Sequence, residues 1–177
     1  TFLFGFEESY GYLKGTYARD KDAVCAAMLA TEMAAYYKAK NMTLYDALQK
    51  LYEKYGHYGE KSQDVYMEGL DGIERRTNTM KNLRENPPKS IGGSPVAFVG
   101  DYLAGTITTL SDGSTKPTGL PKSDVLYYGL TDGDVAVIRP SGTEPKIKIY
   151  YLASAKDAAT LAAKLATYAS ETDKLVK

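Results

Sequence analysis

Five strand-like runs follow one another in the second half of the chain, and they limit its possible folds more than any other feature. The runs span residues 96–102, 106–110, 125–130, 135–139 and 146–152, and turn residues separate nearly all of them. Asp132-Gly133, between two of these runs, adopts positive backbone dihedral angles easily and predicts a tight hairpin. The pattern therefore predicts a largely antiparallel sheet.

Four segments have the apolar spacing of helices, and they cover residues 21–40, 43–55, 70–85 and 155–175. Asp20 is expected to cap the first, whose many alanines predict close packing. Thr43 with Asp46 three residues later predicts the start of the second, and Gly56 its end. The sheet and the last two helices predict an α+β unit in the second half, with a domain boundary near Tyr66.

The charge and cysteine content exclude several classes of protein. The chain has 22 Lys plus Arg residues and 22 Asp plus Glu residues, so it has no broad positive electrostatic field that would favour binding to nucleic acid or to an anionic membrane. Cys25 is the single cysteine, which excludes an internal disulfide and indicates a reducing compartment, the cytoplasm. The longest apolar stretch, residues 23–37, is too short to span a bilayer, and residues 1–6 read as a strand rather than a signal peptide.

A candidate anion site follows the fourth strand-like run, with the sequence Arg139-Pro140-Ser141-Gly142-Thr143-Glu144-Pro145. The Arg139 guanidinium offers paired donors that match phosphate oxygens, and the Ser141 and Thr143 hydroxyls can each donate one more hydrogen bond. Gly142 leaves the backbone amides open to an anion. The alternative is a solvated hairpin loop in which Arg139 pairs with Glu144.

A second candidate site is the turn Gly5-Phe6-Glu7-Glu8-Ser9-Tyr10-Gly11-Tyr12. The Glu7 carboxylate can accept hydrogen bonds from two sugar hydroxyls, and Ser9 can donate or accept another. The alternative is a charged strand end with no ligand. A glycosidase pair is excluded, because Glu7 and Glu8 are adjacent and would point to opposite faces of an extended chain.

Two other features predict no site. In Asp132-Gly133-Asp134 the residues that follow are Val135-Ala136-Val137, which add no oxygen ligand, so a hairpin turn is expected rather than a metal site. His57, the single histidine, follows the predicted end of a helix without a nucleophile nearby in the sequence, which favours a surface or packing role.

Taken together, the two candidate loops resemble those of the α-D-phosphohexomutases. The turn at residues 5–11 is similar to their sugar-specificity loop, and residues 139–148 are similar to their phosphate-binding loop, in the same order. The likeness extends over essentially the whole chain. It implies the latter part of an α/β/α third domain in residues 1–65, and a TATA-box-binding-protein-like fourth domain, an antiparallel sheet with helices, in residues 66–177.

The resemblance also implies a role for each matching residue. Glu7 and Ser9 would hold sugar hydroxyls, and Lys21 would contact phosphate more weakly. The phosphate that is not transferred would be held by Arg139, Ser141, Gly142 and Thr143. The family's catalytic serine segment and magnesium loop have no counterpart in this sequence, so no catalytic residue or metal ligand is assigned. Magnesium and glucose 1,6-bisphosphate are expected only for the intact enzyme.

The implied function is substrate binding in a phosphoglucomutase that interconverts glucose 1-phosphate and glucose 6-phosphate. The expected partners are the phosphosugar and the N-terminal domains of the same enzyme, with neither nucleic acid nor membrane. The chain alone is expected to be inactive. The alternatives are part of a phosphomannomutase or a phosphopentomutase, a free-standing phosphosugar-binding module, and a structural or regulatory remnant.

Overall fold

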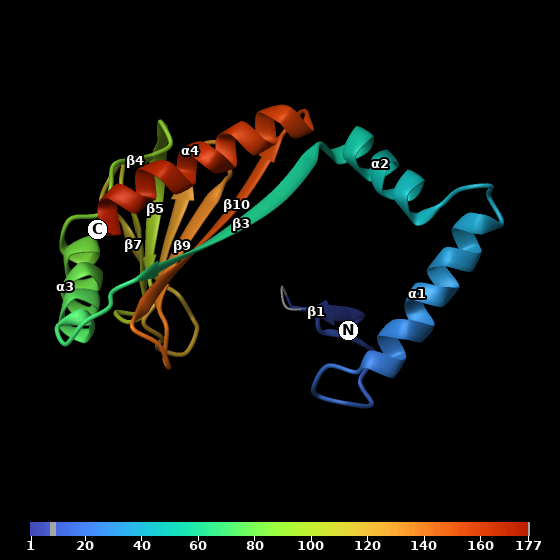
Figure 1. Cartoon of the computed structure of the whole chain (residues 1–177), viewed down its shortest axis with the longest axis horizontal. Coiled ribbons are helices and arrows are strands. Elements are labelled where there is room, and N and C mark those ends of the chain that lie inside the picture. Colours follow the sequence, from blue (N-terminus) through green and yellow to red (C-terminus); the bar gives the residue numbers. More distant parts are fainter. Residues whose placement is uncertain (8–9, 177) are drawn as a thin grey trace. The chain divides into compact units, whose positions relative to one another are not determined.

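The computed structural model describes residues 1–7 and 10–176 of the chain. It contains two compact units, Thr1–Tyr55 and Gly56–Lys177 (Figure 1). The first consists of a short hairpin and two helices, and the second of a large sheet with two helices. The expected combination of α/β and α+β structure is confirmed.

The first unit begins with strands β1 (Phe4–Phe6) and β2 (Tyr12–Lys14), which pair in antiparallel fashion. Helices α1 (Ala23–Lys38) and α2 (Leu44–Tyr55) follow. The cap of α1 is Asp22, whose carboxylate accepts hydrogen bonds from the backbone amides of Val24 and Cys25 at 2.8 and 3.1 Å. The expectation of Asp20 was therefore wrong by two residues, since the Asp20 carboxylate accepts instead from the amide of Lys21.

The start of α2 confirms the predicted capping pair. The Asp46 amide donates to the Thr43 hydroxyl oxygen at 3.1 Å, and the Thr43 amide donates to the Asp46 carboxylate at 2.8 Å. Gly56 follows the last helical residue with a φ of +88°, a backbone conformation that favours glycine. Local chemistry alone thus sets both ends of this helix.

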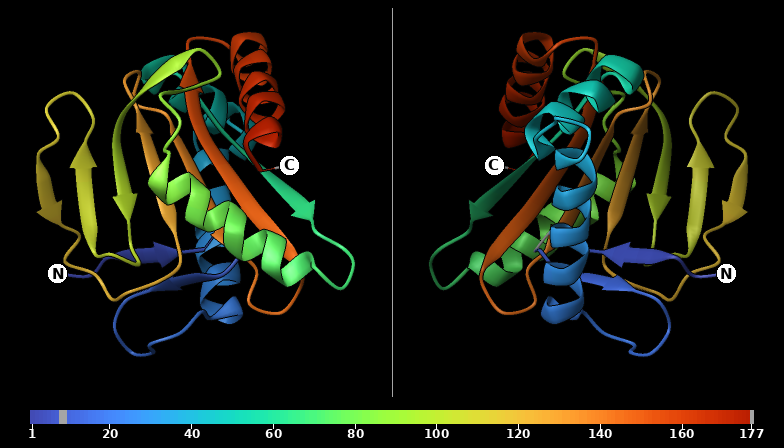
Figure 2. Two further views of the ribbon diagram at one scale, coloured as in Figure 1. Left: turned by 90° about the vertical axis from the view of Figure 1, so that its left-hand side faces the viewer. Right: turned by 90° about the vertical axis from the view of Figure 1, so that its right-hand side faces the viewer.

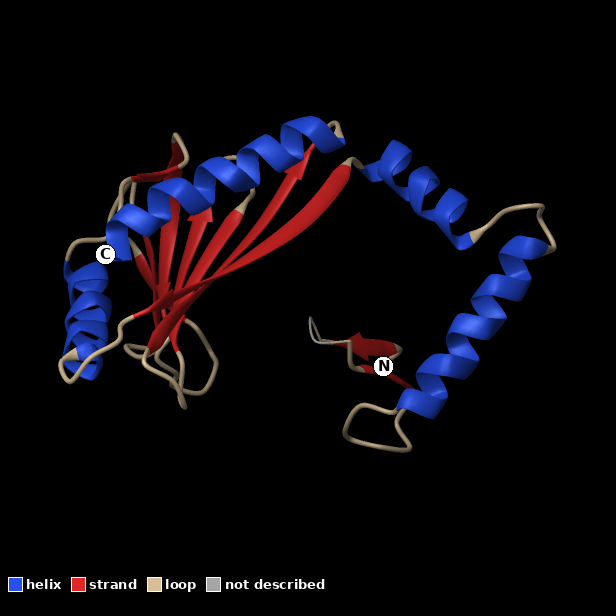
Figure 3. Cartoon of the chain, viewed as in Figure 1, coloured by secondary structure: helices blue, strands red, loops and turns tan. Residues whose placement is uncertain are grey.

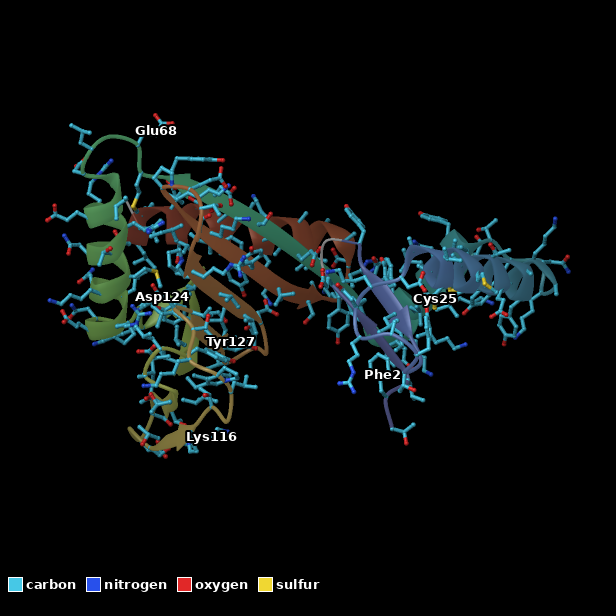
Figure 4. All side chains as sticks on the ribbon, turned by 90° about the horizontal axis from the view of Figure 1, so that it is seen from below. Phe2, Cys25, Glu68, Lys116, Asp124 and Tyr127 are labelled. Atoms are coloured by element: carbon cyan, nitrogen blue, oxygen red, sulfur yellow. The ribbon has the colours of Figure 1, made fainter. Side chains whose placement is uncertain are left out.

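Helix α1 does not show the close packing that its alanine content predicted. None of its residues is buried, and Cys25 is half-buried (Figure 4). Val24 and Met28 are 71% and 64% exposed. The physical reason is that, among the described residues of its unit, α1 contacts only the short strand β2 and helix α2, and these two elements leave its apolar residues largely exposed. Alanine allows close packing but does not supply a partner.

The second unit is built on an antiparallel sheet with the strand order β3-β10-β9-β8-β5-β6-β7, and β4 pairs with β5 (Figure 3). Its strands are β3 (His57–Tyr66), β4 (Ser90–Ile91), β5 (Ser94–Asp101), β6 (Thr106–Thr109), β7 (Thr115–Pro117), β8 (Leu126–Leu130), β9 (Val135–Pro140) and β10 (Lys146–Ala155). Its helices are α3 (Gly72–Glu85) and α4 (Ala158–Val176). The predicted antiparallel sheet is confirmed.

Strand β3 differs from the sequence-based expectation. Only Val65 and Tyr66 were expected to be extended, and the domain boundary was placed beside them. In the structure β3 pairs along its whole length with β10, from His57 opposite Ala155 to Tyr66 opposite Lys146. The compact units consequently divide between Tyr55 and Gly56. The sequence did not predict this strand because most of its side chains are polar. Such side chains are typical of an edge strand that has one face in solvent.

The core lies between the sheet and its helices. Helices α3 and α4 cover one face of the sheet (Figure 2). Alternate residues of the central strands point to that face and are fully buried, among them Tyr128, Ile138, Ile149 and Tyr151. The other positions of the same strands, such as Val137 and Tyr150, are half-buried. One face of the sheet therefore remains accessible from solvent.

The predicted hairpin at Asp132-Gly133 joins β8 to β9, and its carboxylates bind α4. Lys164 of α4 contacts Asp132 at 2.9 Å and Asp134 at 2.5 Å. The Tyr168 hydroxyl donates to Asp134 at 2.7 Å, and the Ser154 amide donates to the other oxygen of Asp134 at 3.0 Å. Because the Asp134 side chain is only 1% exposed, these contacts compensate a buried charge.

None of the helices within residues 1–7 and 10–176 is both long enough and apolar enough to cross a membrane.

Candidate functional site

The candidate phosphate-binding loop connects β9 to β10 in the second unit. Arg139 is near the end of β9, and Lys146 is the first residue of β10. The Ser141 amide donates to the Lys146 carbonyl at 2.9 Å, and the Lys146 amide donates to the Glu144 carbonyl at 2.8 Å. The loop is therefore closed at its base by its own backbone.

Ser141 lies inside this loop and is 8% exposed. Its hydroxyl oxygen accepts from the backbone amides of Glu144 and Thr143 at 3.3 and 3.5 Å, both long for hydrogen bonds. Within the described part of the chain, this hydroxyl accepts these two hydrogen bonds and donates none. The arrangement brings one hydroxyl and two amides together, and the weak amide contacts can be exchanged for contacts to an anion.

Gly142 and Thr143 form the exposed tip of the loop. A Cβ atom built on Gly142 would meet nothing within 4 Å, and the φ of this glycine is not in the left-handed region. Neither packing nor backbone conformation in the described protein therefore requires glycine at this position. Glycine would be required here by an external ligand that approaches the backbone so closely that a side chain would block it.

The Arg139 guanidinium is exposed and leans over the ring of Tyr150, with 5.8 Å between Cζ and the ring centroid. The alternative, an ion pair between Arg139 and Glu144, is not present in the structure. The Glu144 carboxylate instead lies 2.7 Å from the Lys146 ammonium. Among residues 1–7 and 10–176, no carboxylate forms an ion pair with Arg139. This cation remains available to an anionic ligand.

Lys146 anchors the base of the loop. Its side chain is 7% exposed, and its ammonium contacts Asp64 at 2.8 Å, Glu144 at 2.7 Å and the Tyr66 hydroxyl at 3.3 Å. The hydrogen bonds to Asp64 and Glu144 hold the pKa of Lys146 above its usual range. The lysine therefore stays charged and keeps the Glu144 carboxylate engaged, so that less negative charge faces an incoming phosphate.

Arg76 of α3 holds the loop through hydrogen bonds to its backbone. Its Nη1 atom donates to the carbonyl oxygens of Ser141 at 2.7 Å and Glu144 at 3.1 Å. The same carbonyls would otherwise repel an anion at close range, and the guanidinium offsets their partial negative charge. Sequence reasoning missed Arg76 and Lys146 as parts of this site. For Arg76 no local signal could have found it, since 65 residues separate it from Ser141.

The candidate sugar loop connects β1 to β2 in the first unit. The Glu7 amide donates to the Gly11 carbonyl at 2.8 Å, which closes the turn. Glu7 Oε1 lies 3.3 Å from Lys21 Nζ, so the structure brings two predicted site residues together. Both side chains are about half exposed. Ser9 lies outside the described residues.

Gly11 is needed where the chain passes Lys21. A Cβ atom on Gly11 would come within 2.4 Å of Lys21 Cγ. Lys21 also contacts Asp20 at 3.1 Å, and the hydrogen bonds to Asp20 and Glu7 raise the pKa of Lys21. The arrangement places an ammonium and a carboxylate side by side at the turn, and such a pair can donate to and accept from neighbouring sugar hydroxyls.

A metal site has no support in the described residues. Residues 1–7 and 10–176 contain no group of three or more His, Cys, Asp or Glu side chains that could hold a metal ion. Asp132 and Asp134, which flank the hairpin glycine, are bound by Lys164 and Tyr168 instead. The donor sets that the structure describes therefore do not fit magnesium. His57 is half-buried at the start of β3.

Two models of protein families match the chain. Residues 1–55 match the model described as phosphoglucomutase/phosphomannomutase, alpha/beta/alpha domain III. Residues 108–167 match that of the phosphoglucomutase/phosphomannomutase C-terminal domain. The first match contains Glu7 and Lys21, and the second contains the whole loop from Arg139 to Lys146.

Individual relatives agree with these matches. The chain is 39% identical over 148 residues to a phosphoglucomutase of Staphylococcus aureus strain bovine RF122 / ET3-1, and 38% identical to that of strain MRSA252. In both cases the match covers 84% of this chain but only 27% of the relative. The chain thus spans about a quarter of the length of these curated relatives.

A solved structure has a similar fold. It is the open form of the exocytosis-sensitive phosphoprotein pp63/parafusin of Paramecium, a phosphoglucomutase, with a TM-score of 0.61 and 18% identity. The similarity covers 96% of this chain and 29% of that protein. With two domain models in the expected order and relatives near 40% identity, the chain belongs to the phosphoglucomutase/phosphomannomutase family.

Proposed function

We propose that this chain is the substrate-binding portion of a phosphoglucomutase that interconverts glucose 1-phosphate and glucose 6-phosphate. The observation that carries the proposal is the loop between β9 and β10, which combines three groups: an exposed arginine that forms no ion pair within the described residues, an open glycine, and a serine hydroxyl that accepts two long backbone hydrogen bonds. These are the groups that a phosphate monoester needs: a planar cation, a close backbone and hydroxyl donors.

Each candidate residue has a proposed contact. Arg139, Ser141, Gly142 and Thr143 hold the phosphate that is not transferred. Ser141 would release its two long contacts to backbone amides, and those amides would turn to phosphate oxygens. Glu7 and Ser9 hold sugar hydroxyls, and Lys21, which lies beside Glu7, contacts phosphate more weakly.

This binding contributes the positional part of catalysis. Fixing the far phosphate and the ring hydroxyls leaves the opposite oxygen of the sugar oriented toward a phosphoryl donor. We propose that the donor serine, magnesium and the remaining domains belong to the parent enzyme, and that glucose 1,6-bisphosphate is its intermediate. The single Cys25 supports a cytoplasmic, reducing location.

Arg139→Ala tests the proposal. In the parent enzyme, glucose 6-phosphate binding should weaken by about 1.5 to 3 kcal/mol, the contribution of a hydrogen bond to a charged group. Arg75→Ala is the matched control, because Arg75 is an exposed arginine of the same unit that pairs with Asp71. Isothermal titration would measure both variants. Equal affinity in Arg139→Ala and wild type would refute the assignment of this loop, and turnover of glucose 1-phosphate by this chain alone would refute its dependence on other domains.

A further inference from the structure

Strand β3 forms one edge of the sheet in the second unit, and helix α4 packs beside it (Figure 1). Its register with β10 is continuous over 10 residues, and it contains no proline. Natural edge strands are commonly short, bulged or interrupted by proline, because an exposed row of backbone donors and acceptors can pair with another chain. The length and regularity of β3 therefore make it a suitable template for an added strand.

Every second residue of β3 directs its backbone amide and carbonyl away from β10. The Met67 amide donates to the Pro145 carbonyl at 2.7 Å, one pair beyond the end of the ladder. Because these groups alternate along a strand, the odd-numbered residues of β3 bond to β10 and the even-numbered ones point to the free edge. The outward residues are Tyr58, Glu60, Ser62, Asp64 and Tyr66. Within the described part of the chain, their amides and carbonyls bond to no other backbone group.

A groove of about 570 Å³ lies between this strand and α4. Residues 61–63 line it on the strand side, and Ala166, Ala169 and Ser170 line it on the helix side. These helix side chains are small, so space remains for the side chains of an added strand. In peptide recognition by strand addition, the free backbone of the edge gives affinity, and pockets for alternate side chains give specificity. The edge of β3 and this groove supply both.

Two lysines make the groove basic. Odd-numbered side chains of β3 point toward α4, since a Cβ atom on Gly59 would come within 2.9 Å of Leu161 Cδ2. Lys61 is therefore on the same side as Lys174 of α4, which also lines the groove. Both lysines are exposed, and neither forms an ion pair among residues 1–7 and 10–176. An added strand with carboxylates on this side would pair with them.

The carboxylate that lines the groove is already engaged. Asp173 accepts a hydrogen bond from Gln63 Nε2 at 3.0 Å, and Gln63 Oε1 accepts one from the Tyr151 hydroxyl at 3.1 Å. Because Tyr151 is fully buried, these bonds hold both groove side chains in place. The balance of charge that an added strand would meet on this side is positive.

A second copy of this chain does not supply the complementary charge. Two antiparallel copies of β3, bonded through their free edges, would place odd-numbered residues opposite odd-numbered residues on the α4 side. These residues are His57, Gly59, Lys61, Gln63 and Val65. None of them carries a carboxylate. An acidic strand from a different protein therefore fits the groove better than self-association does.

We propose that the free edge of β3, with the groove between β3 and α4, binds an extended segment of another protein that has acidic side chains on the side facing α4. The segment pairs with the even-numbered backbone groups of β3, and its carboxylates contact Lys61 and Lys174. The groove contains no residue of the loop between β9 and β10, so the inference does not depend on the proposed function of that loop.

The test measures amide hydrogen exchange of the 177-residue chain with and without a capped peptide as long as β3, in which glutamate alternates with threonine. Saturating peptide should slow exchange at residues 58, 60, 62 and 64 by about tenfold or more, because their amides gain a partner. The odd-numbered amides, already bonded to β10, should not change. Slowing at alternate residues distinguishes strand addition from general attraction between charges.

Two pairs of variants test the groove and its charge. Ala166→Leu fills the groove and should raise the dissociation constant of the peptide by about fivefold or more, whereas Ala163→Leu, at an exposed alanine of the same helix, should not. Lys61→Glu should raise it by about tenfold and favour a peptide with lysine in place of glutamate. Lys116→Glu is the matched control, because Lys116 is an exposed lysine on β7, the opposite edge strand.

Four outcomes would overturn the proposal. The first is no slowing of exchange in β3 by the glutamate peptide. The second is an equal loss of affinity in Lys61→Glu and Lys116→Glu, because net charge alone would explain it. The third is a dimer of the chain that protects the even-numbered amides without peptide, which would assign the edge to a second copy. The fourth is protection of the same amides in the parent enzyme without peptide, which would assign the edge to another domain.

Discussion

Replacing Arg76 by methionine should loosen the candidate phosphate-binding loop without unfolding the domain around it. The change keeps most of the side-chain length and removes two hydrogen bonds, to the carbonyls of Ser141 at 2.7 Å and Glu144 at 3.1 Å. A hydrogen bond to a charged group contributes about 1.5 to 3 kcal/mol. Arg76 is half-buried, and water can replace part of both hydrogen bonds. We therefore expect the free energy that holds the loop closed to fall by about 2 to 3 kcal/mol.

That loss should be local. The helix that carries Arg76 is held by the buried side chains of Met80 and Leu83, and the loop keeps its backbone bonds between Ser141 and Lys146. Amide hydrogen exchange at these two positions should therefore accelerate by about 30- to 150-fold, the equivalent of 2 to 3 kcal/mol. Exchange in the centre of β10 should not change.

Arg75→Met is the control for this experiment. Arg75 is the preceding residue of α3 and carries the same charge, but it contacts Asp71 and the Glu68 carbonyl rather than the loop. Figure 4 labels Glu68 in the turn before α3. Unchanged exchange at Ser141 and Lys146 in Arg76→Met would refute the supporting role. So would equal acceleration in Arg75→Met, or a uniform acceleration across the whole sheet.

Further predictions concern the tip of the loop and the hairpin at the other end of β9. Gly142→Ala should leave the unfolding temperature unchanged, since its Cβ meets nothing within 4 Å, but should raise the dissociation constant for glucose 6-phosphate by about three- to tenfold; a lower unfolding temperature or an unchanged constant would contradict this. Lys164→Met removes the cation beside the buried Asp134 and should lower the free energy of unfolding, measured in urea, by about 2 to 4 kcal/mol. Lys174 is exposed, so Lys174→Met should leave this free energy unchanged. Equal urea midpoints for the two variants would refute a stabilising contact between Lys164 and Asp134. Burial alone would raise the pKa of Asp132, but hydrogen bonding to Lys164 lowers it on balance, so its stabilisation is present above the unfolded pKa of about 3.9 and is lost as the pH falls through the lower folded value. The stability difference between wild type and Asp132→Asn should therefore shrink below a pH of about 4, and a constant difference down to the acid transition would refute the argument.

Local features of the sequence determined the ends of several elements. Thr43 and Asp46 start α2 as expected, and α3 ends at Glu85, just before Asn86-Pro87-Pro88. Asp132-Gly133 forms the hairpin between β8 and β9. These features involve residues within about four positions of one another, so their energetics are present in the sequence itself. The order and residue types of the two candidate loops were readable for the same reason.

Tertiary structure decided which distant residues meet. Strand β3 exists because its backbone pairs with β10, roughly 90 residues later, and its polar sequence did not show this. Arg76 reaches the loop only because α3 packs beneath β9 and β10, and Lys148 faces Arg139 only through the register of two strands. Register depends on the burial of a whole face of the sheet rather than on any short segment. The sequence by itself thus determined the chemical groups of the candidate loop between β9 and β10, whereas the fold decided which distant residues support that loop.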